Sequence, residues 1–160
     1  DYYDKLQIFL KKLSEYYNRE VIFCAHPRSK KDSSYLKKFK NVEFNKSAYY
    51  AMNADLVVAH DSISLNFPIL FNKPILLVKI EGMELSNKKN NLKLTSEMLG
   101  CGIISINEFN FDQNLIKNKI DVKKYNDYIK RYIKFAGKEK NSWEIVSEKL
   151  LDLQKQQFVT

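Results

Sequence analysis

The chain has 160 residues, which is enough for one ordinary domain with its own apolar core. Its net charge of +8 comes from lysines spread along the whole sequence rather than from a dense basic patch interleaved with aromatic residues, so nucleic-acid binding is not expected. The longest apolar runs are too short to span a bilayer. Cys24 and Cys101 both lie in apolar runs, which predicts buried, reduced thiols in a cytosolic protein.

The first part of the chain alternates between helical and strand-like spacing of apolar residues. The elements predicted there are, in order, a helix over Tyr2 to Tyr17, a strand over Val21 to Ala25, a helix from Ser33 or Ser34 through Phe39, a strand over Val42 to Phe44, a helix that Ser47 caps and that ends at Asn53, and a strand over Leu56 to Ala59.

The alternation continues in the second part. The elements predicted there are a helix over Ser62 to Phe71, a strand over Ile75 to Val78, a helix over Leu92 to Leu99, a strand over Gly102 to Ile106, a helix over Val122 to Phe135 and a last helix that begins at Asn141.

Continuous apolar strands that alternate with amphipathic helices are what a parallel sheet covered on both faces requires. We therefore expect an α/β fold with a doubly wound, Rossmann-like parallel sheet, helices on both faces, and further helices at the C-terminal end, all in one domain over residues 1–160. Because doubly wound domains usually begin with a strand and this chain opens on a helix, we expect it to be the C-terminal part of a longer two-domain chain.

The first strand end that indicates a function is VIFCAHPRS, where an apolar strand runs into His26, Pro27 and Arg28. Ligands of open α/β sheets bind beyond the carboxyl ends of the strands, and a histidine N–H with an arginine suits a phosphate or carboxylate. The alternative is that Pro27 ends the strand, that backbone groups satisfy His26, and that Arg28 is solvated.

A second strand end has the same form, since ADLVVAHDSIS runs into His60, Asp61, Ser62 and Ser64. Two hydroxyls and the free N–H groups at the start of a helix would bind a phosphate or diphosphate. Capping by Ser62 alone is the competing explanation, and Asp61 would repel a phosphate unless it binds a hydroxyl group. Because both histidines of the chain follow strands, we favour a ligand site.

Two further segments allow two interpretations each. Glu81 follows the strand over Ile75 to Val78 and either binds ribose hydroxyls or belongs to an ordinary polar loop. The helix over Val122 to Phe135 has apolar residues on one face and cations opposite, which favours packing on the core over attachment to a membrane surface. The spacing of His and Cys residues fits no zinc site, and the sequence has no Gly-rich phosphate loop.

The HPR strand end, the AD-x-VV-x-H-x-S-x-S stretch and the N-K-P-I turn together resemble the donor-binding half of GT-B fold glycosyltransferases that build bacterial surface polysaccharides. The resemblance covers about Val21 to Gly82. Within this group of enzymes, the chain is similar in particular to HP-motif sialyl, polysialyl and polyol-phosphate transferases of capsule and lipooligosaccharide assembly. It implies that His26 contacts the donor phosphate, and a further hypothesis is that His26 also donates a proton to it as the leaving group departs. It further implies that Ser62 and Ser64 hold the same phosphate and that the segment Glu43, Asn45, Lys46 and Ser47 lies near the nucleotide. With the strand-end residues discussed above, Arg28 and His60 complete the predicted donor-phosphate set, and Asp61 and Glu81 complete the predicted nucleotide or sugar set.

The resemblance also implies metal-independent, inverting transfer from a nucleotide sugar, with no cofactor, to a glycan or lipid-linked acceptor in the cytoplasm or at the inner face of the membrane. The catalytic base would then belong to the other half of such an enzyme. Two alternatives stay open, namely a non-catalytic α/β module that binds a nucleotide or a protein, and an enzyme like the sugar-nucleotide epimerases.

Overall fold

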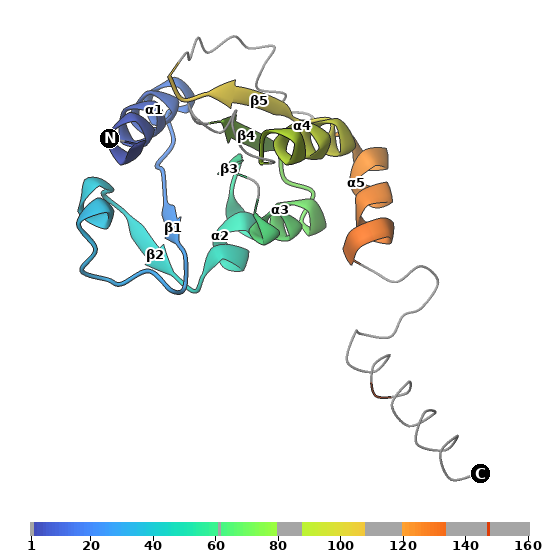
Figure 1. The fold of residues 1–160 in the computed structure, drawn as a ribbon, viewed down its shortest axis with the longest axis horizontal. Coiled ribbons are helices and arrows are strands. Elements are labelled where there is room, and N and C mark those ends of the chain that lie inside the picture. Colours follow the sequence, from blue (N-terminus) through green and yellow to red (C-terminus); the bar gives the residue numbers. More distant parts are fainter. Residues whose placement is uncertain (1, 61, 80–87, 108–119, 134–146, 148–160) are drawn as a thin grey trace.

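The computed structural model describes residues 2–60, 62–79, 88–107, 120–133 and residue 147, and it has an α/β architecture with two small parallel sheets (Figure 1). The predicted sites Asp61 and Glu81, and the helix expected from Asn141, lie outside the described residues.

The larger sheet has the strand order β3-β4-β5, with β3 (Val57–Ala59), β4 (Ile75–Lys79) and β5 (Gly102–Ser105) all parallel. The first four residues of β4 are buried on both sides of the sheet. A central parallel strand needs apolar residues at successive positions, because helices cover both faces. The continuous apolar run over Ile75 to Val78 therefore predicted this strand correctly.

Helices cover both faces of this sheet. On one face, α1 (Tyr2–Tyr17) packs Leu6, Phe9, Leu10 and Leu13 against residues of β4 and β5. On the other face, α3 (Asn66–Leu70), α4 (Lys88–Leu99) and α5 (Val122–Tyr128) enclose a second core cluster, whose buried members are Leu65, Ile69, Ile75, Leu77, Leu92, Leu99 and Tyr125.

The smaller sheet pairs β1 (Phe23–Ala25) with β2 (Val42–Phe44), again in parallel. The crossover between them contains a 3₁₀ helix, η1 (Ser34–Lys38), and α2 (Ser47–Asn53) follows β2. The rings of Phe23 and Phe39 stack with centroids 4.0 Å apart, which holds the end of the crossover against β1.

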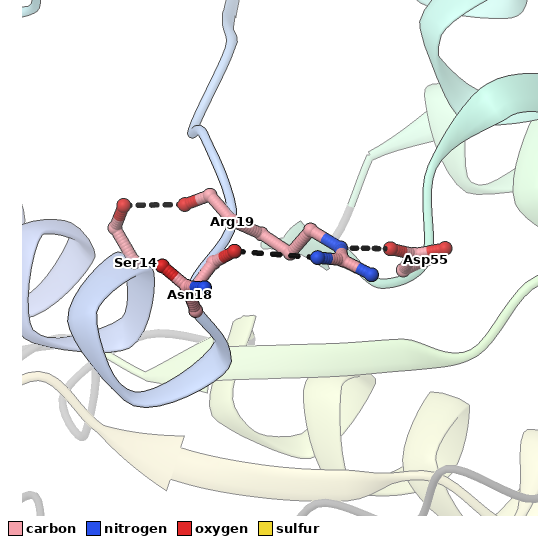
Figure 2. A network of polar contacts seen from close by, with 4 residues as sticks. All are labelled: Ser14, Asn18, Arg19 and Asp55. Carbon is pink, nitrogen blue, oxygen red and sulfur yellow. Dashed lines mark hydrogen bonds and ion pairs between the residues drawn. The ribbon is translucent and has the colours of Figure 1, made fainter.

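The two sheets are connected at the amino ends of β1 and β3 (Figure 2). Arg19 Nε donates to Asp55 Oδ2 at 2.8 Å, Arg19 Nη1 donates to the Asn18 carbonyl, and Ser14 Oγ donates to the Arg19 carbonyl. Both side chains of the ion pair are about two-thirds exposed, so this pair adds little stability. The apolar contacts of α1 with both sheets therefore hold the sheets together.

Several helices differ from those predicted. The segment predicted as one helix over Ser62 to Phe71 is a 3₁₀ turn, η2 (Ile63–Leu65), followed by the short α3. Pro68 explains the break, because it has no N–H to donate to the carbonyl four residues earlier. The helix expected up to Phe39 is the 3₁₀ helix η1, and Ser47 is the first residue of α2 rather than its side-chain cap.

The helix predicted over Val122 to Phe135 is α5 followed by a π-helical turn, η4 (Ile129–Ile133), and Phe135 lies outside the described residues. Tyr125 is buried, and Tyr128, Ile129 and Ile133 pack against the second core cluster. The apolar face of this helix is therefore used in the core, as the favoured interpretation predicted. Among the described residues, no helix has the length and apolar character needed to cross a membrane.

The α/β class predicted from the alternation is confirmed, and all described strand pairs are parallel. Within the described part of the chain, the strands form a pair and a triplet, and no described hydrogen-bonded ladder joins β1 to β3.

Replacing Leu77 with alanine should lower the free energy of unfolding by about 3 kcal/mol, because Leu77 is fully buried in β4 and its loss leaves a cavity. Replacing Leu94, which is 54% exposed on α4, is the matched control and should change it by less than about 0.5 kcal/mol. Urea unfolding followed by circular dichroism measures both values. Equal effects of the two substitutions would contradict the assignment of β4 as the central strand.

Candidate functional site

A cavity of about 600 Å³ lies between the two sheets and is the candidate functional site. Its walls come from β1, from β3, from the apolar face of α1 and from residues along α2. The volume falls within the usual range of small-molecule sites.

The structure brings together only part of the predicted site. Five predicted residues line the cavity, namely His26, Ser47, His60, Ser62 and Ser64. Four others, Arg28, Glu43, Asn45 and Lys46, are described but do not line it.

His26 follows β1 and is exposed at the cavity. The backbone N–H of Arg28 donates to His26 Nδ1 at 3.1 Å, so Nδ1 is an acceptor. In neutral imidazole the other nitrogen then carries the proton. The turn formed by His26, Pro27 and Arg28 thus fixes the tautomer in which Nε2–H can donate to a ligand. Among the described residues, no side chain forms a hydrogen bond with this nitrogen.

His60 follows β3, but both of its ring nitrogens have partners. Nδ1 lies 2.8 Å from the Val78 carbonyl oxygen, which can only accept, so Nδ1 carries a proton. Nε2 therefore accepts from the Tyr2 hydroxyl, whose oxygen lies 2.5 Å away. A contact between His60 and a phosphate, which stays a prediction, would require Tyr2 to move.

Burial favours the neutral form of this pair. Desolvation lowers the pKa of His60 below its usual value, although the hydrogen bond to the Val78 carbonyl acts in the opposite direction. Desolvation, together with repulsion from Tyr3, raises the pKa of Tyr2 to about 12. At neutral pH the Tyr2 hydroxyl is therefore protonated and can donate to a neutral His60.

The two serines near His60 have different partners. Ser62 Oγ accepts a hydrogen bond from the Ser64 backbone N–H at 3.2 Å, so Ser62 acts as the cap of η2, as the capping interpretation predicted. This contact uses the oxygen of Ser62 as an acceptor and leaves its hydroxyl proton for a ligand. Both residues are exposed and line the cavity.

An ion pair between Glu43 and Lys46 stabilises the turn between β2 and α2. Glu43 Oε2 lies 3.0 Å from Lys46 Nζ, and the hydrogen bonds from Lys46 and Tyr50 lower the pKa of the Glu43 carboxyl. Asn45, at the turn between them, has a φ of +57°, a conformation that asparagine tolerates better than most residues. The Glu43 side chain, at the middle of β2, is thus bound to Lys46 in the turn that follows its strand and is not free at the cavity.

Several lining residues were not predicted as site residues. Tyr2 and Tyr3 come from α1, Ser29 and Tyr35 from the crossover after β1, and Tyr50 from α2. Tyr35 donates to Ser29 Oγ at 2.6 Å and stacks on Tyr3. The sequence signal for Ser29 was its place directly after HPR, whereas the helical spacing of Tyr2 gave no sign that it reaches a histidine 58 positions later.

Both cysteines are free thiols, as expected, but Cys24 is exposed and lines the cavity, so the prediction that it is buried was wrong. Alternation along β1 gives the reason, because Ala25 is buried and its neighbour Cys24 points the other way. Among the described residues, no group of three or more His, Cys, Asp or Glu side chains could hold a metal ion.

Comparisons of the chain with protein-family models, with curated proteins and with solved structures found no match.

An NMR titration should place the pKa of His60 below about 6.5, the ordinary value for histidine, because burial disfavours its charged form. The free energy of unfolding should fall as the pH drops below about 6.5, since the unfolded chain then takes up a proton that folded His60 resists. The His26→Gln variant leaves one histidine, which assigns the resonance to His60. A midpoint at or above about 6.5 would contradict the buried Tyr2–His60 pair.

Proposed function

We propose that the chain is the donor-binding domain of a nucleotide-sugar-dependent glycosyltransferase that acts in surface polysaccharide biosynthesis. One observation carries the proposal: His26 after β1 and the serines Ser62 and Ser64 after β3 line the same cavity, although they come from different sheets. The resemblance of these segments to GT-B enzymes predicted that His26 and these serines hold one phosphate.

The proposal includes a fold in which the two sheets are halves of one doubly wound sheet. Joining β1 to β3 would give the strand order 2-1-3-4-5, a common order in doubly wound proteins. In that order, strands are added toward one edge of the sheet from β1 to β2 and toward the other edge from β3 to β5. Ligands of such sheets bind at the point where this direction of strand addition changes, which is between β1 and β3. Pairing of β1 with β3 would close the inner part of the cavity and would leave the residues that follow the two strands, among them His26 and Ser62, at the carboxyl edge of the sheet.

The chemistry at the cavity suits a leaving phosphate. As the bond from the sugar to the nucleotide breaks, negative charge develops on the phosphate and needs fixed donors. His26 Nε2–H and the hydroxyls of Ser62 and Ser64 are donors of this kind. In the neutral tautomer, His26 stabilises the phosphate through the Nε2–H hydrogen bond alone, and no metal ion is needed for this role. Transfer of a full proton to the leaving group would require the imidazolium form, in which Nδ1 carries a proton and no longer accepts from the Arg28 N–H.

The remaining part of the cavity suits the nucleoside. The hydroxyls of Ser29 and Ser47 and the ring of Tyr50 lie on its wall, so they would provide both polar contacts and a stacking surface. On this proposal Ser47 and Tyr50 replace Glu43 as the contacts from the β2–α2 region, because Glu43 is bound to Lys46. The acceptor would be a glycan or a lipid-linked glycan, in the cytoplasm or at the inner face of the membrane.

A non-catalytic nucleotide-binding module is the second candidate. The observation that favours it is that Glu43 and His60, two side chains that could act as bases, are held by internal partners. The two candidates share the ligand and differ in whether the sugar is transferred.

Titration calorimetry of the chain with CMP, CDP, UDP and GDP tests the proposed ligand. One of these nucleotides should bind saturably, and the His26→Ala, Ser62→Ala variant should bind it about 100-fold more weakly, because two hydrogen bonds to a charged phosphate are lost.

The Ser34→Ala variant is the control, because Ser34 is an exposed serine in η1 that does not line the cavity. Its affinity should equal that of the unmodified chain. Equal binding by the double variant would refute the site. Sugar transfer by an enzyme containing this chain, lost in the His26→Ala variant, would separate the transferase from the non-catalytic module.

A further inference from the structure

The crossover between β1 and β2 is rich in exposed cations. Residues 28–40 contain one acidic residue, Asp32, and the exposed cations of the segment are Arg28, Lys30, Lys31, Lys37 and Lys40, which we call the basic crossover. Lys38, the other cation of the segment, is paired with Asp4 of α1.

The five exposed cations of the basic crossover outnumber its single carboxylate, that of Asp32. Within the described part of the chain, none of its five side chains forms an ion pair. Lys31 has one charge-related contact, since its Nζ lies 5.9 Å from the centroid of the Phe44 ring. A set of like charges without counter-charges favours an anionic partner.

Packing holds the basic crossover in place and determines what it presents. Leu36 is buried and Phe39 stacks on Phe23, and these two residues are three positions apart, as one face of a 3₁₀ helix requires. Lys37 and Lys40 follow them by one position and are exposed. The apolar side of the segment thus faces the protein and the cations face solvent.

The same packing distinguishes between partners. The two aromatic residues of the segment, Tyr35 and Phe39, stack on Tyr3 and Phe23, so they are not available to stack on nucleic-acid bases. No residue of the segment is a large exposed apolar side chain, so nothing in it would insert between acyl chains. The partner must be recognised by charge alone.

The basic crossover also lies outside the cavity, because none of its five side chains lines it. A chain-like polyanion is held best in a groove, whereas fluid lipid headgroups can rearrange around separate cations on an open surface. Clusters of four to eight basic residues are typical of segments that bind anionic lipids. We propose that the basic crossover binds the anionic headgroups of a membrane surface.

This proposal does not depend on the ligand of the cavity. Because Arg28 lies two residues after His26, binding of the basic crossover would bring the mouth of the cavity close to the lipid surface. Membrane attachment through the helix over Val122 to Phe135 was the less favoured interpretation of that helix, and its apolar face packs in the core.

Co-sedimentation of the full 160-residue chain with vesicles tests the proposal. The chain should bind vesicles of phosphatidylcholine mixed with phosphatidylglycerol, should not bind phosphatidylcholine alone, and should be released by roughly 0.5 M salt. The Lys30→Gln, Lys31→Gln variant and the Lys37→Gln, Lys40→Gln variant should each lower the partition coefficient about tenfold.

The Lys123→Gln, Lys130→Gln variant is the matched control, because it removes two exposed charges from α5 and η4 and should change partitioning by less than about twofold. Unchanged thermal unfolding would show that all three variants fold. Equal losses in all three variants, or no binding to anionic vesicles, would overturn the proposal. Binding to long-chain polyphosphate but not to vesicles would overturn it in favour of a polymeric partner.

Discussion

The apolar face of α1 is the contact on which the rest of the structure depends. Its buried residues pack against β4 and β5, and partly buried residues of β1 and β3 pack around the same cluster. Because the Arg19–Asp55 pair is largely exposed, burial of apolar area by α1 provides most of the attraction between the two sheets. Leu6, Leu10 and Leu13 also line the cavity, so one set of contacts both stabilises the fold and sets the width of the candidate site.

Parallel strands explain why the polar residues that follow β1 and β3 gather at the same end of the cavity, whereas Ser14, Arg19, Glu20 and Asn53 line it near the amino ends of these strands. In each sheet all strands run in the same direction, so the loops that follow them meet at one edge. His26 and Ser62 therefore line the same space although 36 positions separate them in the sequence. The residues of β1 and β3 form the mainly apolar middle of that space, between the polar groups that line it at both ends, and a mainly apolar lining with a few polar groups is common for sites that bind small molecules.

The sequence predicted the features that depend on local patterns. The apolar run over Ile75 to Val78 identified a central strand, and the two strand-end histidines identified residues that line one cavity. Features that depend on distant partners were not predictable. Neither the grouping of the strands into two sheets nor the contact between Tyr2 and His60 leaves a periodic signal, because each is decided by packing between segments far apart in the chain. Pro68 was a local signal that the helix after β3 is interrupted. The apolar residues keep a helical spacing across this position, so their spacing alone predicted one continuous helix.

The two histidines show why position at a strand end is not enough to assign a role. Each follows a short apolar strand and each lines the cavity. His26 is followed by Pro27 and Arg28, and the backbone N–H of Arg28 donates to His26 Nδ1. This contact fixes the tautomer of His26, and its Nε2–H has no partner among the described residues. His60 is half-buried, donates to the Val78 carbonyl and accepts from Tyr2, so both of its nitrogens are used inside the protein. On the proposed function, His26 is therefore the residue that acts on the ligand, while His60 connects α1 to the sheet and holds one wall of the cavity in place.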